Sequence, residues 1–197
     1  PADTDTWWHL ASGQYMVEQR ALFSADPFSH TFKGMPWYYP KLGQIILYGL
    51  YALGGWPALS LAVAGLVTAS FWLIWRQIEA NPFVAAFSVI LGAIVSSVVW
   101  MARPQMLSFL LTALTAYLLH RFKRHNDRLL PWLPLVMLLW ANVHGGFAIG
   151  VMLMLAYLLG ETVNHLTRHE SDPVISWPRL KHLLWVIGLR LAVVAVN

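Results

Sequence analysis

The sequence predicts an all-α fold, a polytopic bundle of transmembrane helices, and three observations support this class. First, 58% of the 197 residues are hydrophobic and only 11% are charged, whereas a soluble domain carries roughly 25% charged residues. Second, the apolar residues after position 42 form runs long enough to cross a bilayer. Third, tryptophans recur near the ends of these runs, where indole suits the membrane interface: Trp56, Trp75, Trp100, Trp132, Trp140 and Trp177.

Charge and composition exclude several other classes. The net charge of +4 is small, so we interpret it as a signal of membrane orientation and expect no nucleic-acid partner. The chain has no cysteine, which rules out disulfides and thiolate metal sites. It also lacks the G-x-S-x-G, P-loop and H-E-x-x-H motifs.

The whole chain, 1–197, is interpreted as one membrane domain. Residues 1–41 form an outer loop, with a helix that begins near Thr6. Residues 42–54 are too short to span and end at Gly54 and Gly55, which predicts an interfacial helix. About six membrane segments follow within 57–197: 57–75, 83–100, 105–120, 129–142, 145–163 and 183–197. The start at Pro1 and the apolar end at Asn197 indicate a piece of a longer protein.

Lys and Arg are distributed unevenly between the two faces of this bundle. If every segment crosses, one face receives eight cations: Arg76, Arg121, Lys123, Arg124, Arg128, Arg168, Arg179 and Lys181. The opposite face receives Arg20, Lys33, Lys41 and Arg103, together with Asp3, Asp5, Glu18 and Asp26. Cytoplasmic loops carry an excess of Lys and Arg. We therefore expect residues 1–41 and the turns at 103–105 and 142–146 to share the outer face.

The first outer loop contains the candidate catalytic residues. Asp3 and Asp5 form a D-x-D pair, which can share a divalent cation or a proton; alternatively, Asp5 or Thr6 caps a helix. His9 follows Asp5 by one helical turn, so both can face one site, unless His9 is a solvated interfacial residue. Asp26 precedes Pro27, which favours an extended backbone and a role in a turn.

Three further polar residues are candidates for binding a phosphate or substrate. Lys41 can hold a lipid phosphate or extend its ammonium group to the membrane surface. Arg103 can clamp a phosphate with two hydrogen bonds or contact lipid headgroups. His144 precedes Gly145 and Gly146, which permit a close backbone approach to a ligand or simply a tight turn.

These polar turns also carry a family resemblance. The segments DTDTWWHL at 3–10, Gly13, DPFSHT at 26–31 and GMPW at 34–37 look like the first outer loop of a group of bacterial polytopic membrane proteins. RPQ at 103–105 and WANVHGGF at 140–147 resemble the same group. Those proteins are described as similar to class-C (GT-C) glycosyltransferases. The resemblance covers most of the chain and corresponds to the N-terminal half of a longer protein without its first helix.

The resemblance implies a GT-C-like fold and a donor sugar on a polyprenyl-phosphate carrier. It also implies an acid in the first outer loop that is catalytic or binds metal, and Asp5 matches that position best. The resulting catalytic set is Asp5, Asp3 and His9, while Lys41, Arg103 and His144 bind phosphate or substrate. A divalent cation, held by Asp3 and Asp5, is left open because a later outer loop shows no second acidic motif.

Three functions are consistent with these features. The first is an integral membrane glycosyltransferase at the outer face of the bacterial inner membrane. The alternative is a non-catalytic polytopic subunit of a larger membrane complex, which uses its aromatic surfaces as contacts. The third is a lipid or small-solute transporter, against which the scarcity of polar residues at mid-membrane positions counts.

Overall fold

The computed structural model describes residues 4–125 and 130–167, together with positions 178, 181, 183–185 and 188. The described residues form helices in the order α1 (Thr4–Gln19), α2 (Lys41–Trp75), α3 (Pro82–Ser96), η1 (Ser97–Val99), α4 (Gln105–His125), η2 (Leu130–Trp132), α5 (Leu133–Val143) and α6 (Phe147–Thr167). Within them, the only bridge of β type joins Ala25 and Pro36. The predicted all-α class is therefore confirmed.

Three of the described helices are long and apolar enough to cross a membrane. They are Lys41–Trp75, Pro82–Val99 and Phe147–Thr167, which contain or overlap the runs predicted at 57–75, 83–100 and 145–163. The run at 129–142 corresponds to the shorter apolar stretch Leu130–Val143. The run at 105–120 lies in α4, and most of 183–197 lies outside the described residues.

Helix α2 is broken at two consecutive glycines. Gly54 has φ −159° and ψ 21°, and Gly55 has φ 60° and ψ −147°, a left-handed conformation that glycine adopts without steric cost. Pro57 then lies in the first turn of the second part, where its missing N–H removes no helical hydrogen bond. The helix predicted over 42–54 is thus separate from the one that continues to Trp75, although its interfacial position stays a prediction.

Helix α4 extends further than the sequence predicted. The residues from 121 to 125 were expected in a loop, which is wrong because the helix continues to His125. Polar contacts with neighbouring elements support this last turn. Lys123 Nζ lies 2.7 Å from Glu161 of α6, and Arg124 lies 3.1 Å from Glu79 of the α2–α3 connection.

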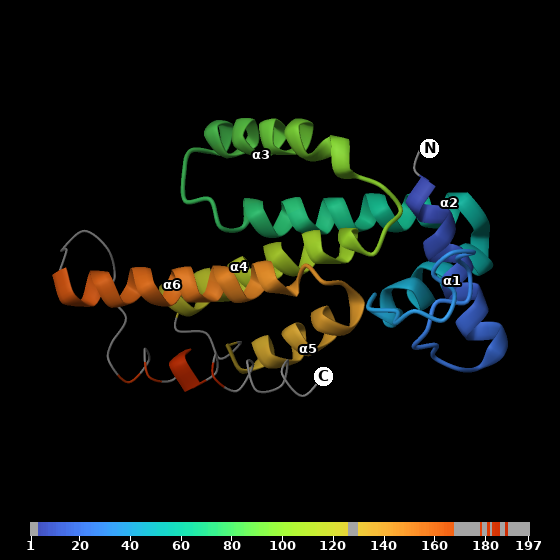
Figure 1. Cartoon of the computed structure of the whole chain (residues 1–197). Coiled ribbons are helices and arrows are strands. Elements are labelled where there is room, and N and C mark those ends of the chain that lie inside the picture. Colours follow the sequence, from blue (N-terminus) through green and yellow to red (C-terminus); the bar gives the residue numbers. More distant parts are fainter. Residues whose placement is uncertain are drawn as a thin grey trace.

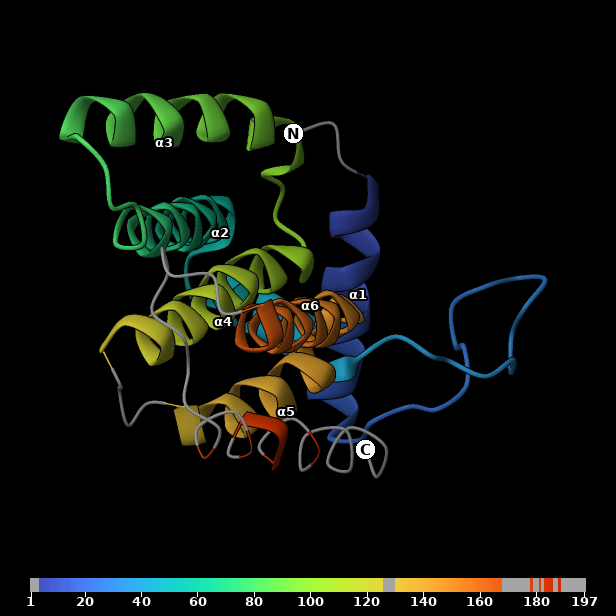
Figure 2. The same cartoon turned by 90° about the vertical axis from the view of Figure 1, so that its left-hand side faces the viewer.

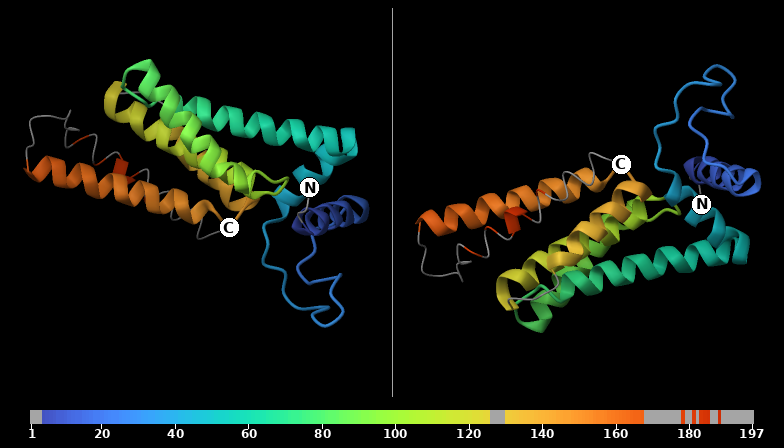
Figure 3. Two further views of the ribbon diagram at one scale, coloured as in Figure 1. Left: turned by 90° about the horizontal axis from the view of Figure 1, so that it is seen from above. Right: turned by 90° about the horizontal axis from the view of Figure 1, so that it is seen from below.

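Helix α4 packs against both α2 and α6, and α3 lies on the outer side of α2 (Figures 1 and 3). Helix α1 crosses the end of this bundle and packs on α2 (Figure 1). The α3–α4 connection and the α5–α6 turn lie at the same end (Figure 1). The largest buried cluster surrounds Trp140 between α4, α5 and α6. The polar turns of the sequence are therefore brought to the end of the bundle that carries α1.

Two glycines allow the backbones at this end to approach closely. A Cβ at Gly13 of α1 would collide with the carbonyl oxygen of Gln44. A Cβ at Gly43 would collide with the carbonyl oxygen of Val143 and lie 2.9 Å from the Cβ of Pro104. The start of α2 is thus clamped between α1 and both polar turns, and this packing positions the candidate site.

The loop after α1 projects sideways from the bundle (Figure 2) and is ordered by local contacts. The carboxylate of Asp26 accepts hydrogen bonds from the N–H of Phe28 at 2.8 Å and of Ser29 at 3.1 Å, and from the Ser29 hydroxyl. The predicted turn role of Asp26 is confirmed. The bonds from the Ser29 hydroxyl and the Phe28 N–H lower the pKa of Asp26 below 3.8. Trp37 packs edge-on against Trp8 of α1.

Candidate functional site

Asp5 and Arg103 meet at the α1 end of the bundle. Asp5 lies in the first turn of α1, where the helix dipole favours a negative charge. Arg103 lies between η1 and α4, and its Nη1 is 2.9 Å from the Asp5 carboxylate. The side chains are 25% exposed for Arg103 and 46% for Asp5. A pair this accessible adds little to stability, so it remains available to a ligand.

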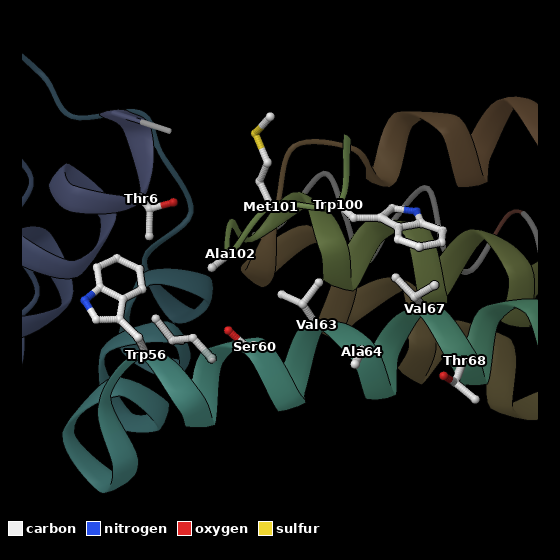
Figure 4. Close-up of a pocket in the computed structure, with 11 residues that line it drawn as sticks. Thr6, Trp56, Ser60, Val63, Ala64, Val67, Thr68, Trp100, Met101 and Ala102 are labelled. Carbon is white, nitrogen blue, oxygen red and sulfur yellow. The ribbon is translucent and has the colours of Figure 1, made fainter. Parts of the chain in front are cut away.

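An apolar cleft begins beside this ion pair. The Trp56 cleft has a volume of about 510 Å³ and is lined by Thr6, by one face of α2 and by the α3–α4 connection (Figure 4). Its lining residues on α2 run from Trp56 to Thr68, a distance of roughly 18 Å at 1.5 Å per residue. Thr6 and Ala102 in the lining are the chain neighbours of Asp5 and Arg103. The cleft is therefore elongated and apolar, with a pair of charges at one end.

His9 is not part of the lining of this cleft. It is only 9% exposed and belongs to the buried face of α1, together with Leu10 and Gly13. Its ring lies against that of Trp8, with centroids 3.7 Å apart. The expectation of a solvated interfacial histidine is wrong for the same reason, because packing of α1 on α2 encloses this face.

Lys41 lies in a different cleft. The Lys41 cleft has a volume of about 640 Å³ and separates the loop after α1 from the α5–α6 turn. Its polar lining comes from Lys41, Tyr38, Tyr39 and Asn142. Lys41 is absent from the lining of the Trp56 cleft and Arg103 from that of the Lys41 cleft, so their joint binding of one phosphate stays a prediction.

His144 lines a third cleft. The His144 cleft, of about 610 Å³, lies between α2, the start of α4 and the α5–α6 turn. The Nδ1 atom of His144 is 2.8 Å from Ser108 Oγ and accepts the N–H of Gly146 at 3.0 Å. Burial lowers the pKa of His144 below 6.5, so the ring is neutral at pH 7.

The sequence interpretation missed the polar cluster around Ser108. The indole N–H of Trp140 donates to Ser108 Oγ at 2.7 Å, and Trp140 is 0% exposed. Its predicted place at the membrane interface is wrong, because α5 packs this ring between α4 and α6. Ser108 and Trp140 are separated by 32 residues, so no local spacing in the sequence indicated their contact.

The described residues do not fit a divalent cation. Within 4–125 and 130–167, no three His, Asp or Glu side chains are close enough to hold a metal. The guanidinium of Arg103 pairs with Asp5, and its positive charge opposes a second cation there. Asp3 lies outside the described residues. We therefore derive no step that requires a metal.

Comparisons with protein families, characterised proteins and solved structures find no match to this chain.

Proposed function

We propose that this chain is a membrane glycosyltransferase of class-C type that transfers a sugar from a polyprenyl-phosphate donor. The observation that carries the proposal is the Asp5–Arg103 ion pair at one end of the apolar Trp56 cleft. A polyprenyl-phosphate sugar has two corresponding parts, a long apolar chain that suits the cleft and an anionic head that suits its charged end. The resemblance of the loop and turn motifs to a GT-C-like group supports the same assignment.

The donor fits this site in one orientation. Its prenyl chain lies along α2 from Trp56 toward Thr68, where burial of apolar surface contributes about 0.8 kcal/mol per CH₂ group. Its phosphate lies beside Arg103, because a guanidinium binds phosphate oxygens with two parallel hydrogen bonds. Phosphate binding draws Arg103 away from Asp5. The Asp5 carboxylate is then accessible to the second substrate.

The reaction assigns separate tasks to the two side chains. The hydroxyl oxygen of the acceptor attacks the anomeric carbon, and the bond from that carbon to the phosphate oxygen breaks. The hydroxyl proton passes to Asp5, which acts as a general base. The polyprenyl phosphate leaves with the electron pair of the broken bond, and Arg103 stabilises its added negative charge. The acceptor is unspecified beyond its hydroxyl group.

The charge distribution supports an orientation for this site. The end opposite α1 carries Arg76, Lys123 and Arg124, and cytoplasmic ends are rich in such cations. We therefore place the α1 end at the outer face of the bacterial inner membrane. A sugar carried on a membrane lipid can enter the site there from the bilayer.

The decisive experiment compares Asp5→Asn with the wild-type protein. Transfer of labelled sugar from a polyprenyl-phosphate donor should fall by roughly 10²–10⁴-fold, the usual contribution of a positioned acid or base. Folding should be almost unchanged because asparagine also suits the start of a helix. Glu18→Gln, which removes an exposed acid from the same helix, is the matched control and should retain the wild-type rate.

Two outcomes would contradict the proposal. Equal rates for Asp5→Asn and wild type would remove Asp5 from the mechanism. Absence of transfer by the wild-type protein with every donor tested, combined with stable co-purification of other membrane proteins, would instead support the accessory-subunit function.

A further inference from the structure

The His144 cleft differs from the Trp56 cleft in the polar groups at its end. Its lining is apolar along α2, α4 and α6, where Ile74, Phe109 and Ile149 contribute side chains. No Lys, Arg, Asp or Glu belongs to the described lining. An anionic head in such a place would lack a compensating charge, at a large cost in free energy. The cleft therefore suits a neutral molecule.

The hydrogen bonds at the cleft determine which ring nitrogen of His144 carries the proton. The N–H of Gly146 donates to Nδ1 of His144, so Nδ1 carries no proton and Nε2 carries the hydrogen of the neutral ring. Ser108 then donates its hydroxyl hydrogen to Nδ1 and accepts the indole N–H of Trp140. This chain of donors holds the ring in one tautomer and one orientation.

The Nε2–H group of His144 is left for a ligand. Both hydrogen bonds of the ring use Nδ1, and within 4–125 and 130–167 Nε2 has no hydrogen-bond partner and is not enclosed. His144 belongs to the lining of the cleft, and the ligand proposed below meets this donor there. Gln105, Ser108 and Thr112 are the other polar residues of the lining. A mostly apolar cavity with a few directed polar groups is the usual form of a small-ligand site.

Ser108 is not a nucleophile in this arrangement. A serine beside a histidine has the composition of a nucleophile and its base. However, the oxygen of Ser108 already accepts the indole N–H of Trp140, and the residue is only 6% exposed. The shared Nδ1 also receives the Gly146 N–H. The pair is suited to orienting His144 rather than to covalent chemistry.

We infer that the His144 cleft binds a neutral lipid alcohol, whose hydroxyl oxygen accepts the Nε2–H of His144 while its hydrocarbon chain lies between α2 and α4. A neutral hydroxyl oxygen accepts this hydrogen bond without introducing a charge into a lining that contains no Lys, Arg, Asp or Glu. The site is distinct from the Trp56 cleft because the two linings share no residue, although Val99 and Trp100 make the clefts neighbours at the α3–α4 connection. It does not depend on the proposed transferase activity.

The test uses two probes with the same hydrocarbon chain, farnesol and farnesyl phosphate. Binding of each tritiated probe is measured on the purified full chain in phosphatidylcholine nanodiscs, with empty nanodiscs subtracted as background. Farnesol should bind in the His144 cleft and farnesyl phosphate in the Trp56 cleft. Neither probe should displace the other.

Two matched variants assign each probe to a cleft. Ala116 lines the His144 cleft and Ala64 lines the Trp56 cleft, and neither is fully buried. Ala116→Leu should weaken farnesol binding roughly tenfold or more by overpacking the cleft and leave farnesyl phosphate unaffected. Ala64→Leu should have the reverse effect. His144→Phe should weaken farnesol binding by about 2–10-fold, which corresponds to one hydrogen bond.

Several results would overturn the inference. One is saturable binding of farnesol that survives Ala116→Leu but is lost in Ala64→Leu. Another is farnesyl phosphate that competes with farnesol and is equally sensitive to Ala116→Leu, because the cleft would then accept an anion. Absence of farnesol binding to the wild-type protein would also refute it. Sugar transfer plays no part in these measurements. The farnesyl phosphate results rest on the donor site proposed above, whereas the farnesol results with Ala116→Leu and His144→Phe test the His144 cleft without it.

Discussion

The two ends of the bundle both contain ion pairs, but in different surroundings. At the α1 end, Asp5 and Arg103 are 46% and 25% exposed and adjoin an apolar cleft. At the opposite end, Lys123 and Glu161 are 15% and 5% exposed, with a separation of 2.7 Å. Their neighbours are packed helices, and none of the clefts described above includes either residue in its lining.

This difference separates the proposed binding site from a structural contact. The Lys123–Glu161 pair joins α4 to α6 and is enclosed, so Lys123 cannot turn toward a ligand without leaving the Glu161 carboxylate buried and without this cation. The Asp5–Arg103 pair can open at little cost, because water and a ligand reach both groups. An ion pair therefore indicates function here only together with its exposure and an adjoining cleft.

The largest expected effect concerns the sidedness of the two ends. The chain contains no cysteine, so single cysteines can report it without background. In intact bacterial cells, a membrane-impermeant maleimide should label Ser24→Cys in the loop after α1 and should fail to label Ala80→Cys in the α2–α3 connection. Both positions are exposed, so permeabilised cells should label both. Labelling of both variants in intact cells would contradict opposite sides.

A second prediction compares the two kinds of ion pair directly. Lys123→Met leaves the buried Glu161 carboxylate without its cation and should lower the free energy of unfolding by about 3–5 kcal/mol. Arg124→Gln breaks a contact with Glu79, whose side chain is 52% exposed, and should cost less than about 1 kcal/mol. Unfolding in mixed detergent micelles titrated with SDS measures both. Similar losses for the two variants would remove the distinction between enclosed and accessible pairs.

The close packing at the α1 end leads to a third prediction. Gly43→Ala should destabilise the protein by about 1–3 kcal/mol, because the new methyl group overpacks against the backbone of Val143. Gly49 lies in the same part of α2 with open space around its Cα. Gly49→Ala should therefore stabilise the helix by about 0.5–1 kcal/mol. The same SDS titration measures both variants. An unchanged free energy of unfolding for Gly43→Ala would show that the start of α2 is not tightly packed against the two turns.

The smallest expected effect is a pH dependence confined to the loop. The folded-state pKa of Asp26 is below 3.8, so its stabilising contribution is complete above about pH 3.8 and is lost as the pH falls through the folded value. The near-ultraviolet circular dichroism of the aromatic loop should hold from pH 7 to 4 and decrease below that range. Asp26→Ala should reduce the signal at neutral pH and remove this acid transition. An unchanged transition in that variant would assign it to another group.

The sequence was sufficient for features that depend on neighbouring residues. Gly54 and Gly55 predicted where α2 breaks, because two successive residues without a side chain weaken a helix locally. Pro27 predicted the turn at Asp26 through its effect on the preceding backbone. The shared end of Asp5 and Arg103 also followed from the order of the apolar runs, since each run reverses the direction of the chain.

Features that depend on packing between distant segments could not be predicted in this way. Trp140 and Trp132 are both tryptophans near the ends of an apolar run, yet one is 0% and the other 58% exposed. Only the packing of α4 and α6 on α5 distinguishes them. Similarly, nothing near Lys123 in the sequence indicates Glu161, so the helical end of α4 was mistaken for a loop.

The break in α2 also determines how the protein matches a bilayer. As one straight helix, the 35 residues of Lys41–Trp75 would measure about 52 Å, well beyond the roughly 30 Å of a hydrocarbon core. Such an excess is relieved only by tilting the helix or thickening the membrane around it. The break leaves residues 56–75 as the spanning part, with a length of about 30 Å. If this part spans the bilayer, the backbone conformation of Gly55 sets the hydrophobic thickness to which the helix is matched.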